Sequence, residues 1–259
     1  LIVGITEYEP MDYQDENGKW TGFDAEFAEA VAKEMGVEAE FVVIDWDNKF
    51  FELESKAIDC IWNGMTITDE VKLNTACSDP YAKNEQVVVM NKDKVNNYKD
   101  ADSMKGLKFA VESGSAAESA ASDLGFANVT AVKAQSDALM EVQSGSADAC
   151  IIDITMAASM TGEGTSYADL TQGISLTKEE YGIGFRKNSD MKDTMNGYIK
   201  QFKENGKLAE LSEKYGVAVA ELVRRAWRGT NYVHALPSCQ NTEKPIGQRG
   251  AQTPLSVFV

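Results

Sequence analysis

The stretch Glu52-Leu-Glu-Ser-Lys-Ala-Ile-Asp59 resembles a second stretch, Glu141-Val-Gln-Ser-Gly-Ser-Ala-Asp148, and each is followed by an apolar segment. Short apolar segments of this kind are typical of buried strands. Laid over one another without a gap, the two stretches place Gly64 opposite Asp153. The similarity predicts two half-size α/β units whose strands end at corresponding positions.

Strands and helices alternate on both sides of this repeat. We expect strands at 1–6, 40–44, 58–63, 107–112, 129–133 and 149–153. One helix is expected to start at a cap formed by Asp24 and to end at Gly36, and others are expected at 48–56, 116–124 and 136–144. Such alternation predicts an α/β fold in which mainly parallel sheets are flanked by helices on both faces.

Bulk composition excludes several classes of protein. The chain has 259 residues, of which 43% are hydrophobic, enough for one large domain or two small ones. No run of apolar residues is long enough to cross a membrane, so we expect a soluble chain. The net charge of -16 argues against nucleic-acid binding, which needs basic patches. The chain begins inside an apolar run, so we expect any export signal to be absent from it.

Residues that usually carry catalysis or bind metals are scarce. The only histidine is His234, which excludes an HExxH zinc site and makes a Ser-His-Asp triad improbable. This scarcity argues against an enzyme, and we expect no cofactor and no metal. The cysteines form no CxxC pair; they are Cys60, Cys77, Cys150 and Cys239. Cys60 and Cys77 lie on nearby predicted strands, so a disulfide stays open, although we favour small buried thiols.

The composition changes near Gly216. Residues 217–259 contain four of the five arginines, the sole histidine and three of the five prolines. With five basic and two acidic side chains this segment carries +3, so residues 1–216 carry -19. From residue 231 onward no helical or alternating period is present. We interpret 217–259 as an atypical tail that is not part of the fold, and favour a foreign origin over a functional basic arm.

Open α/β sheets bind ligands beyond the carboxyl ends of their parallel strands, where helix N-termini supply free N–H groups. In this chain those ends fall at 6–10, 46, 63–66, 113–115 and 153–155, and polar and aromatic residues gather there. These segments are therefore the predicted ligand site.

Six motifs occur in order over residues 1–216: Tyr8-Glu-Pro10, Gly18-Lys-Trp-Thr-Gly-Phe-Asp24, Asn63-Gly-Met-Thr-Ile-Thr68, Cys77-Ser-Asp-Pro-Tyr81, Glu112-Ser-Gly-Ser115 and Gly182-Ile-Gly-Phe-Arg186. With them the chain resembles the amino-acid-binding family of bacterial ABC-transporter solute-binding proteins. The resemblance implies the two-lobed type II periplasmic-binding-protein fold with a two-strand hinge. Lobe 1 would comprise 1–86 and 183–216, lobe 2 would comprise 87–182, and the hinge would lie near 85–90 and 181–185.

The resemblance also implies ligand-binding roles, each beside a structural alternative. Tyr8 and Trp46 match the aromatic residues that enclose the ligand, although aromatics are often plain core. In the strand-end segment that starts at Asn63, Gly64 and Thr66 match residues that present polar groups to the ligand, or they form a turn. In the segment that starts at Ser113, Ser115 matches the carboxylate site, or it caps a helix. Asp153 matches the carboxylate that binds the α-ammonium, or it is a buried structural aspartate.

One position departs from the family pattern. Val71 stands where the family usually has an arginine that binds the α-carboxylate, and Lys72 follows it. Valine donates no hydrogen bond, and lysine lacks the planar fork of arginine. Lys49 is our candidate substitute, with a solvated surface lysine as the alternative. Because Glu7 and Glu9 flank Tyr8, a cationic or zwitterionic amino acid is favoured as the ligand.

The resemblance further implies an extracytoplasmic monomer that delivers an amino acid to an ABC permease, with a lipid anchor before Leu1 left open. Two alternatives use the same fold. One is a ligand-sensing receptor domain. The other is an enzyme similar to cyclohexadienyl dehydratase, in which Glu112 or Asp153 would act as the general acid.

Overall fold

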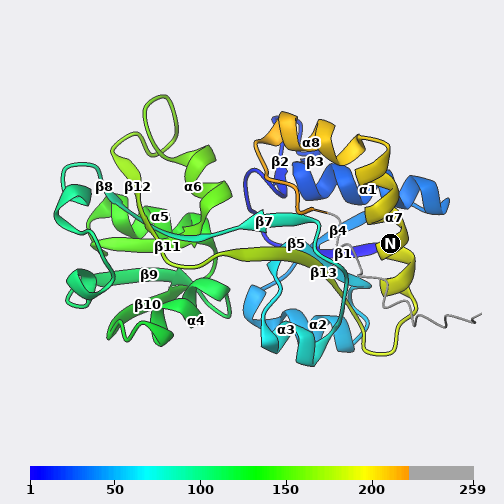
Figure 1. Ribbon diagram of the computed structural model, residues 1–259, viewed down its shortest axis with the longest axis horizontal. Helices are drawn as coiled ribbons and strands as arrows, with labels where there is room; N and C mark the ends of the chain where they lie inside the picture. The colour runs from blue at the N-terminus through cyan, green and yellow to red at the C-terminus, as the bar shows by residue number, and fades with distance from the viewer. Residues whose placement is uncertain (222–259) are drawn as a thin grey trace, which may run out of the picture. The chain divides into compact units, whose positions relative to one another are not determined.

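Two β-sheets organise residues 1–221, the part of the chain that the computed structural model describes (Figure 1). The first sheet has six strands, β1 (Ile2–Ile5), β4 (Glu40–Val43), β5 (Cys60–Thr66), β6 (Ala76–Cys77), β7 (Ala82–Asn84) and β13 (Glu179–Phe185). Strand β1 runs parallel to β4 and β5, whereas β13 is antiparallel to β5, β6 and β7. This sheet and its helices form lobe 1.

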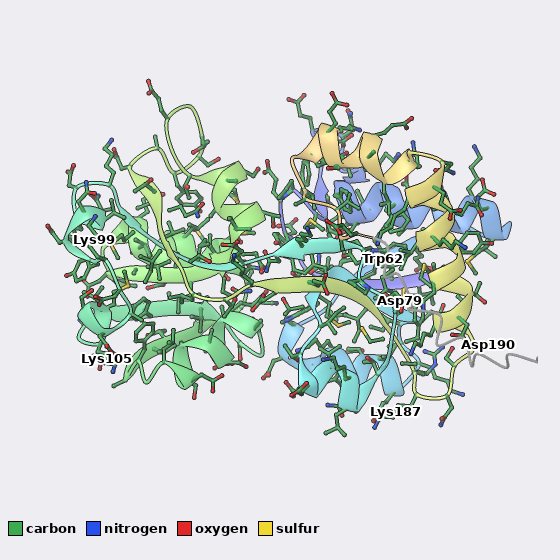
Figure 2. The ribbon with its side chains drawn as sticks, in the orientation of Figure 1. Trp62, Asp79, Lys99, Lys105, Lys187 and Asp190 are labelled. Atoms are coloured by element: carbon green, nitrogen blue, oxygen red, sulfur yellow. The ribbon has the colours of Figure 1, made fainter. Side chains whose placement is uncertain are left out.

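Helices cover both faces of the first sheet (Figure 1). One side carries α1 (Phe23–Met35), α7 (Met191–Glu204) and α8 (Lys207–Tyr215). The other side carries α2 (Lys49–Glu54), which follows the 3-10 turn Trp46–Asn48, and α3 (Asp69–Asn74). A small hairpin of β2 (Tyr13–Gln14) and β3 (Trp20–Thr21) precedes α1. Trp62 of β5 is fully buried between these layers (Figure 2).

The second sheet has five strands in the order β10-β9-β11-β8-β12 and forms lobe 2. They are β8 (Gln86–Asn91), β9 (Lys108–Glu112), β10 (Asn128–Val132), β11 (Ala149–Asp153) and β12 (Leu170–Ser175). Strands β10, β9 and β11 are parallel, and β8 runs antiparallel to its neighbours. The helices are α4 (Ala116–Asp123), α5 (Gln135–Ser144) and α6 (Ile154–Met160), with 3-10 turns at Val95–Asn97 and Asp102–Met104. Lys99 and Lys105 lie on the exposed surface of this lobe (Figure 2).

The chain passes between the lobes twice, at Glu85 between β7 and β8, and at 176–178 between β12 and β13 (Figure 1). The second crossing comes earlier than the predicted 181–185. Strand β13 already pairs with β7 at Glu179, opposite Asn84, so residues 179–182 lie in the first sheet rather than in lobe 2.

The end of lobe 1 also differs from the predicted boundary at residue 216. Val217 and Ala220 are each 1% exposed, and Val219 forms a bridge with Ala82. Backbone hydrogen bonds from Lys83 to Ala218 and from Ala220 to Tyr81 fix this segment. Lobe 1 therefore continues to Ala220, and the rest of the proposed tail from residue 222 lies outside the described residues.

Helix α1 shows why its sequence forms this element and where the prediction was wrong. Phe23, Phe27 and Val31 recur at helical spacing and are fully buried, and Gly36 ends the helix with φ 73°. Asp24, however, is not the cap, because the N-cap is Gly22. The Asp24 side chain turns inward and accepts hydrogen bonds from the Gly64 N–H at 2.6 Å and the Tyr81 hydroxyl at 2.7 Å.

The internal repeat has a structural counterpart. Asp59 and Ile2 form a pair of hydrogen bonds. The Asp59 N–H donates to the Ile2 carbonyl oxygen at 2.7 Å, and the Ile2 N–H donates to Asp59 Oδ2 at 3.0 Å. Asp148 makes the same pair with Lys108, at 2.8 and 3.0 Å. In each lobe an aspartate thus fixes the start of one central strand against its parallel neighbour.

Cys60, Cys77 and Cys150 are free thiols, so the Cys60–Cys77 disulfide left open above is not formed; Cys239 lies outside the described residues. Burial raises the pKa of Cys77 to about 11, which keeps that thiol protonated. Within residues 1–221 there is no group of side chains suited to hold a metal ion and no helix of membrane-spanning length and hydropathy.

Candidate functional site

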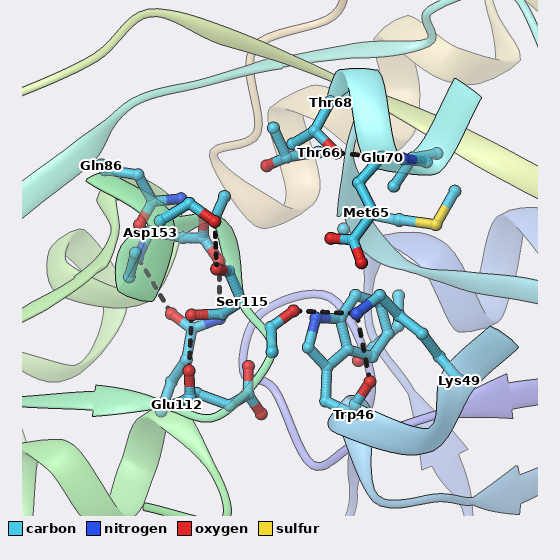
Figure 3. A pocket seen from close by; sticks show the side chains of 18 residues that line it. Trp46, Lys49, Met65, Thr66, Thr68, Glu70, Gln86, Glu112, Ser115 and Asp153 are labelled. Carbon is cyan, nitrogen blue, oxygen red and sulfur yellow. Dashed lines mark hydrogen bonds between the residues drawn. The ribbon is translucent and has the colours of Figure 1, made fainter. Parts of the chain in front are cut away.

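A narrow pocket of about 40 Å³ lies where β5 of lobe 1 faces β9 and β11 of lobe 2 (Figure 3). It is lined from lobe 1 by Trp46, Lys49, Asn63, Gly64, Met65, Thr66, Thr68, Glu70 and Val71, and from lobe 2 by Gln86, Glu112, Gly114, Ser115, Ala116, Ala117, Ser119, Gln135 and Asp153. All the predicted ligand-binding residues except Tyr8 and Ser113 are among them. The repeat positions Gly64 and Asp153 thus meet in one pocket.

Glycine is the only residue that fits at position 64, because of its backbone conformation and the two tyrosine rings beside it. Its φ is +53°, and a Cβ there would lie 2.7 Å from Cε1 of Tyr8 and 3.3 Å from the Tyr181 ring. Only glycine lets the backbone of β5 pass this close to the aromatic rings and form this part of the pocket wall.

Tyr8 lies behind Gly64 rather than in the pocket wall. Its side chain is 2% exposed, and its hydroxyl bonds to the Tyr181 hydroxyl at 2.7 Å and to the Thr155 hydroxyl. Tyr181 belongs to β13 and Thr155 to the first turn of α6 in lobe 2. Tyr8 therefore connects the two lobes in this arrangement, and it reaches the pocket only by supporting Gly64.

Lys49 points into the pocket and is only 4% exposed, so the solvated surface alternative is wrong. Its Nζ lies 5.0 Å from the centroid of the Trp46 ring and 4.7 Å from that of Phe50. It donates hydrogen bonds to the carbonyl oxygens of Trp46 at 3.2 Å and Gly114 at 2.8 Å. Burial lowers the pKa of Lys49, and nearby carboxylates, Glu70 first, oppose that shift.

Val71 fills the family arginine's position with an apolar side chain. It is 3% exposed and belongs to the same hydrophobic cluster as Trp46. Its N–H donates to the Thr68 hydroxyl at 3.1 Å, which caps α3. Lys72 is exposed, pairs with Asp69 at 3.5 Å, and does not line the pocket. Among the described pocket residues, Lys49 is therefore the sole cation.

Ser115 is the N-cap of α4. Its hydroxyl accepts the Glu118 N–H at 3.3 Å and donates to the Glu112 carbonyl oxygen at 2.7 Å. The next two residues, Ala116 and Ala117, line the pocket, and N–H groups in the first turn have no intrahelical partner. This helix start favours an anionic group through its free N–H groups and its dipole.

Ser113 is not brought to the pocket. Its N–H donates to the Val132 carbonyl oxygen at 2.9 Å, and the residue lies at a separate surface depression beside Asp45 and Asp47. The polar segment after β9 thus turns at Gly114, and only its later part faces the pocket.

Asp153, at the end of β11, is 5% exposed and is held by three side-chain amides. Its Oδ1 accepts from Asn84 and, at 2.7 Å, from Gln86, and its Oδ2 accepts from Gln135 at 2.5 Å. Burial and then the nearby Glu179 raise the pKa of Asp153 to about 6, while the amide hydrogen bonds lower it. The carboxyl is thus an ionisable group fixed at the pocket wall.

The polar side-chain atoms of two other predicted residues form hydrogen bonds within the protein. Thr66 donates its hydroxyl to Glu179 Oε2 at 2.9 Å. The Asn63 amide bonds to Thr6 and donates to Asp12 Oδ2 at 2.7 Å. Their ligand-binding roles stay predictions, because both residues line the pocket while their side chains form hydrogen bonds within lobe 1.

The sequence analysis missed Glu112 as a ligand residue and named it only for the enzyme alternative. It ends β9 as Asp153 ends β11, so the same strand-end rule could have found it. Its side chain is 3% exposed, and its Oε1 has no hydrogen-bond partner among the described residues. Burial, followed by Asp153, raises the pKa of Glu112 to about 8, while Lys49 lowers it.

The two acids expected beside Tyr8 are not part of the pocket wall. Glu7 and Glu9 do not line it, and Glu9 instead accepts a hydrogen bond from Ser159 of lobe 2 at 3.0 Å. The acidic lining comes from Glu70, Glu112 and Asp153. Gln135 also escaped prediction, because a glutamine at a helix start carries no distinguishing signal in a single sequence.

A pocket closed between two α/β lobes that are joined by two crossing segments is typical of solute-binding proteins. Residues 1–218 match the model of the bacterial extracellular solute-binding proteins, family 3, and the chain belongs to that family. The predicted family and the predicted two-lobed fold are thus confirmed.

Two curated relatives illustrate the family. The chain is 31% identical over 218 residues to the L-cystine-binding protein TcyJ of Escherichia coli strain K12, covering 83% of this chain and 82% of the relative. It is 34% identical over 226 residues to the arginine-binding extracellular protein ArtP of Bacillus subtilis, covering 83% and 85%. Its homologues are amino-acid-binding solute-binding proteins of ABC transporters.

Solved structures give the same picture. An ancestral arginine-binding protein bound to arginine matches with a TM-score of 0.75 and 33% identity, over 83% of this chain and 97% of that one. The ancestral amino acid-binding protein AncCDT-1, a precursor of cyclohexadienyl dehydratase, matches with a TM-score of 0.76 and 34% identity, over 83% and 94%.

Proposed function

We propose that this chain captures an amino acid between its two lobes outside the cytoplasm and delivers it to an ABC permease. The observation that carries the proposal is the pairing of unlike charges across one pocket. Lys49 of lobe 1 and Asp153 of lobe 2 lie on different sides of it (Figure 3). An α-amino acid presents an ammonium and a carboxylate close together, and these two residues complement that pair.

The assignment of groups follows from this chemistry. Asp153 accepts the α-ammonium, and its three amide partners hold the carboxylate in place for that contact. The α-carboxylate binds at the start of α4 and to the Lys49 ammonium, which replaces the arginine that is absent at Val71. The Trp46 ring packs against the ligand's aliphatic carbons.

Closure of the lobes traps the ligand. Several contacts already join the lobes, among them Lys49 with Gly114, Tyr8 with Thr155, and Ser159 with Glu9. A pocket of about 40 Å³ is smaller than an amino acid, so we infer that the lobes separate to admit it. A ligand that contacts both walls then shifts the population toward the closed state.

Titration calorimetry against the twenty common L-amino acids and L-cystine tests the proposal. We expect one or a few of them to bind, and Asp153→Asn to weaken that binding by about tenfold or more, since a charge-assisted hydrogen bond is lost. Asp193→Asn, which changes an exposed residue of α7, is the matched control. If a folded protein binds none of these ligands at millimolar concentration, the proposal is wrong.

One observation favours a second candidate, an enzyme of the cyclohexadienyl-dehydratase type. With its pKa raised to about 8, Glu112 holds a proton at neutral pH, as a general acid must. Incubation with prephenate or arogenate decides between the two functions. Formation of an aromatic product that Glu112→Gln abolishes would establish the enzyme, and unchanged substrate would leave the binding function.

A further inference from the structure

We infer that Glu112 is a ligand-binding carboxylate that accepts a cationic nitrogen at the end of the ligand's side chain. The pocket would then select an amino acid whose side chain ends in an ammonium or guanidinium group. The inference rests on the proposed capture of an amino acid, and it assigns to Glu112 a role separate from that of Asp153.

The side chain of Glu112 lines the pocket, where a ligand can reach it. It stands at the end of β9, between β10 and β11, and lines the pocket beside Ser115 and Asp153 (Figure 3). The Ser115 hydroxyl donates to the backbone oxygen of Glu112 and not to its carboxyl group. The side-chain Oε1 is buried without a hydrogen-bond partner among the described residues. A buried carboxyl left in this state is costly, and a ligand donor would remove the cost.

The Asp153 carboxylate, unlike that of Glu112, is hydrogen-bonded by the protein itself. Amides from Asn84, Gln86 and Gln135 compensate its charge, so the protein itself maintains that carboxylate. Gln86, in turn, has its own Oε1 buried and without a hydrogen-bond partner within residues 1–221. Glu112 and Gln86 are therefore two unsatisfied acceptors in the pocket wall. Ammonium and guanidinium groups carry several donors and no acceptor, so they suit such a site.

The charges of the wall agree with this assignment. Three carboxyl groups line the pocket, those of Glu70, Glu112 and Asp153, against the single ammonium of Lys49. A zwitterionic ligand uses one carboxylate for its ammonium and Lys49 for its carboxylate, which leaves Glu112 unpaired. A ligand with an additional cationic group pairs with it.

The groups that face Glu112 set its protonation. Asp153 from β11 and Asp137 from α5 raise its pKa in addition to burial, and Lys49 from α2 lowers it. Below about pH 8 the free protein therefore holds a proton on Glu112, and an arriving cation releases that proton. Affinity for a cationic side chain should rise with pH up to about 8, by at most about tenfold per pH unit.

Calorimetry with L-arginine and L-citrulline tests the inference, since the two differ chiefly in the charge of the terminal group. We expect the unmodified protein to bind arginine about tenfold or more tightly than citrulline. Glu112→Gln should reduce arginine affinity by about tenfold or more and citrulline affinity by less than about threefold. Glu163→Gln, on an exposed segment of the same lobe, is the matched control and should change neither.

A second measurement needs no variant. In two buffers of different ionisation enthalpy at about pH 7, the heat of arginine binding should differ by the heat of the released proton, and the heat of citrulline binding should not. The inference is overturned if a neutral amino acid binds better than arginine, if Glu112→Gln keeps the arginine preference, or if no proton is released. Absence of binding by any amino acid would instead overturn the proposed function.

Discussion

Lys49 of lobe 1 donates a hydrogen bond to the Gly114 carbonyl oxygen of lobe 2, with 2.8 Å between Nζ and oxygen. The Lys49 Nζ lies over the rings of Trp46 and Phe50, and the ammonium has only carbonyl oxygens as hydrogen-bond partners among the described residues. A buried ammonium without an anionic partner is a ready site for a carboxylate. The same lysine thus joins the two closed lobes and provides the positive charge for a ligand carboxylate, which Val71 cannot provide.

Replacing Lys49 should therefore affect binding more than folding. We expect Lys49→Met to weaken amino-acid affinity by about tenfold or more, because the ligand carboxylate loses its one cationic partner. The thermal midpoint should stay the same or rise, since a buried charge is exchanged for an apolar chain of similar length. Calorimetry and thermal unfolding measure the two effects.

The control for this change is Lys72→Met, which removes an exposed lysine that does not line the pocket. It should leave the affinity within about twofold. Equal losses in both variants would show that long-range charge, rather than contact with Lys49, determines affinity, and the assignment of Lys49 would be wrong.

Gly114 provides a separate test of closure. A Cβ at Gly114 would lie 2.8 Å from Cα of Asp47 in lobe 1, and its φ of +69° is unfavourable for other residues. We expect Gly114→Ala to hold the lobes apart and lower ligand affinity by about tenfold or more. X-ray scattering should then lose the decrease in radius of gyration that ligand produces in the unmodified protein.

A glycine far from the cleft separates this effect from a general response to the added methyl group. Gly197 lies on an exposed face of α7, and nothing lies within 4 Å of the position its Cβ would take. Gly197→Ala should raise stability by about 0.5–1 kcal/mol and leave closure unchanged. Normal closure in Gly114→Ala would refute the close approach of the lobes at this point.

Sequence reasoning found the architecture because the pattern of strands and helices is local. The repeat that pairs Gly64 with Asp153 could be predicted, since each residue follows its own apolar strand. The second lobe crossing could not be placed, because the pairing of Glu179 with Asn84 joins positions distant in sequence. The composition of one strand does not show which distant strand it will pair with.

The site was predicted in part for the same reason. Lys49 was a candidate by its position after Trp46, yet its burial depends on the approach of Gly114 from the other lobe. Tyr8 was expected in the pocket, but its ring packs behind Gly64, which leaves no room for a Cβ between the backbone and the ring. Glu112 follows the same strand-end pattern as Asp153 and was overlooked because the resemblance assigned it no ligand contact.

Four buried acids give the fold an unusual dependence on pH. Burial raises the pKa of Glu112 to about 8 and that of Asp153 to about 6. Burial also raises the pKa values of Asp12 and Asp24, which have no exposed surface. Each has one carboxyl oxygen that lacks a hydrogen-bond partner among the described residues. All four groups bind protons more tightly in the folded chain than in the unfolded chain.

Their contribution to stability is therefore fully present below about pH 4 and is lost as the pH rises through the folded pKa values. We expect the thermal midpoint of the ligand-free protein to fall between about pH 5 and pH 8, the reverse of the behaviour of salt-bridged carboxylates. Glu112→Gln should reduce this fall, because glutamine does not ionise. Asp69→Asn, which changes an exposed acid, should leave it intact.

The same linkage connects stability to the ligand. A cationic side chain bound at Glu112 favours the ionised carboxylate, so saturating arginine should stabilise the protein more at about pH 8 than at about pH 6. Citrulline should show no such difference. A midpoint that rises steadily from about pH 5 to pH 8 without ligand would contradict the raised pKa values, because carboxyl groups that ionise freely in the fold cannot produce the expected loss.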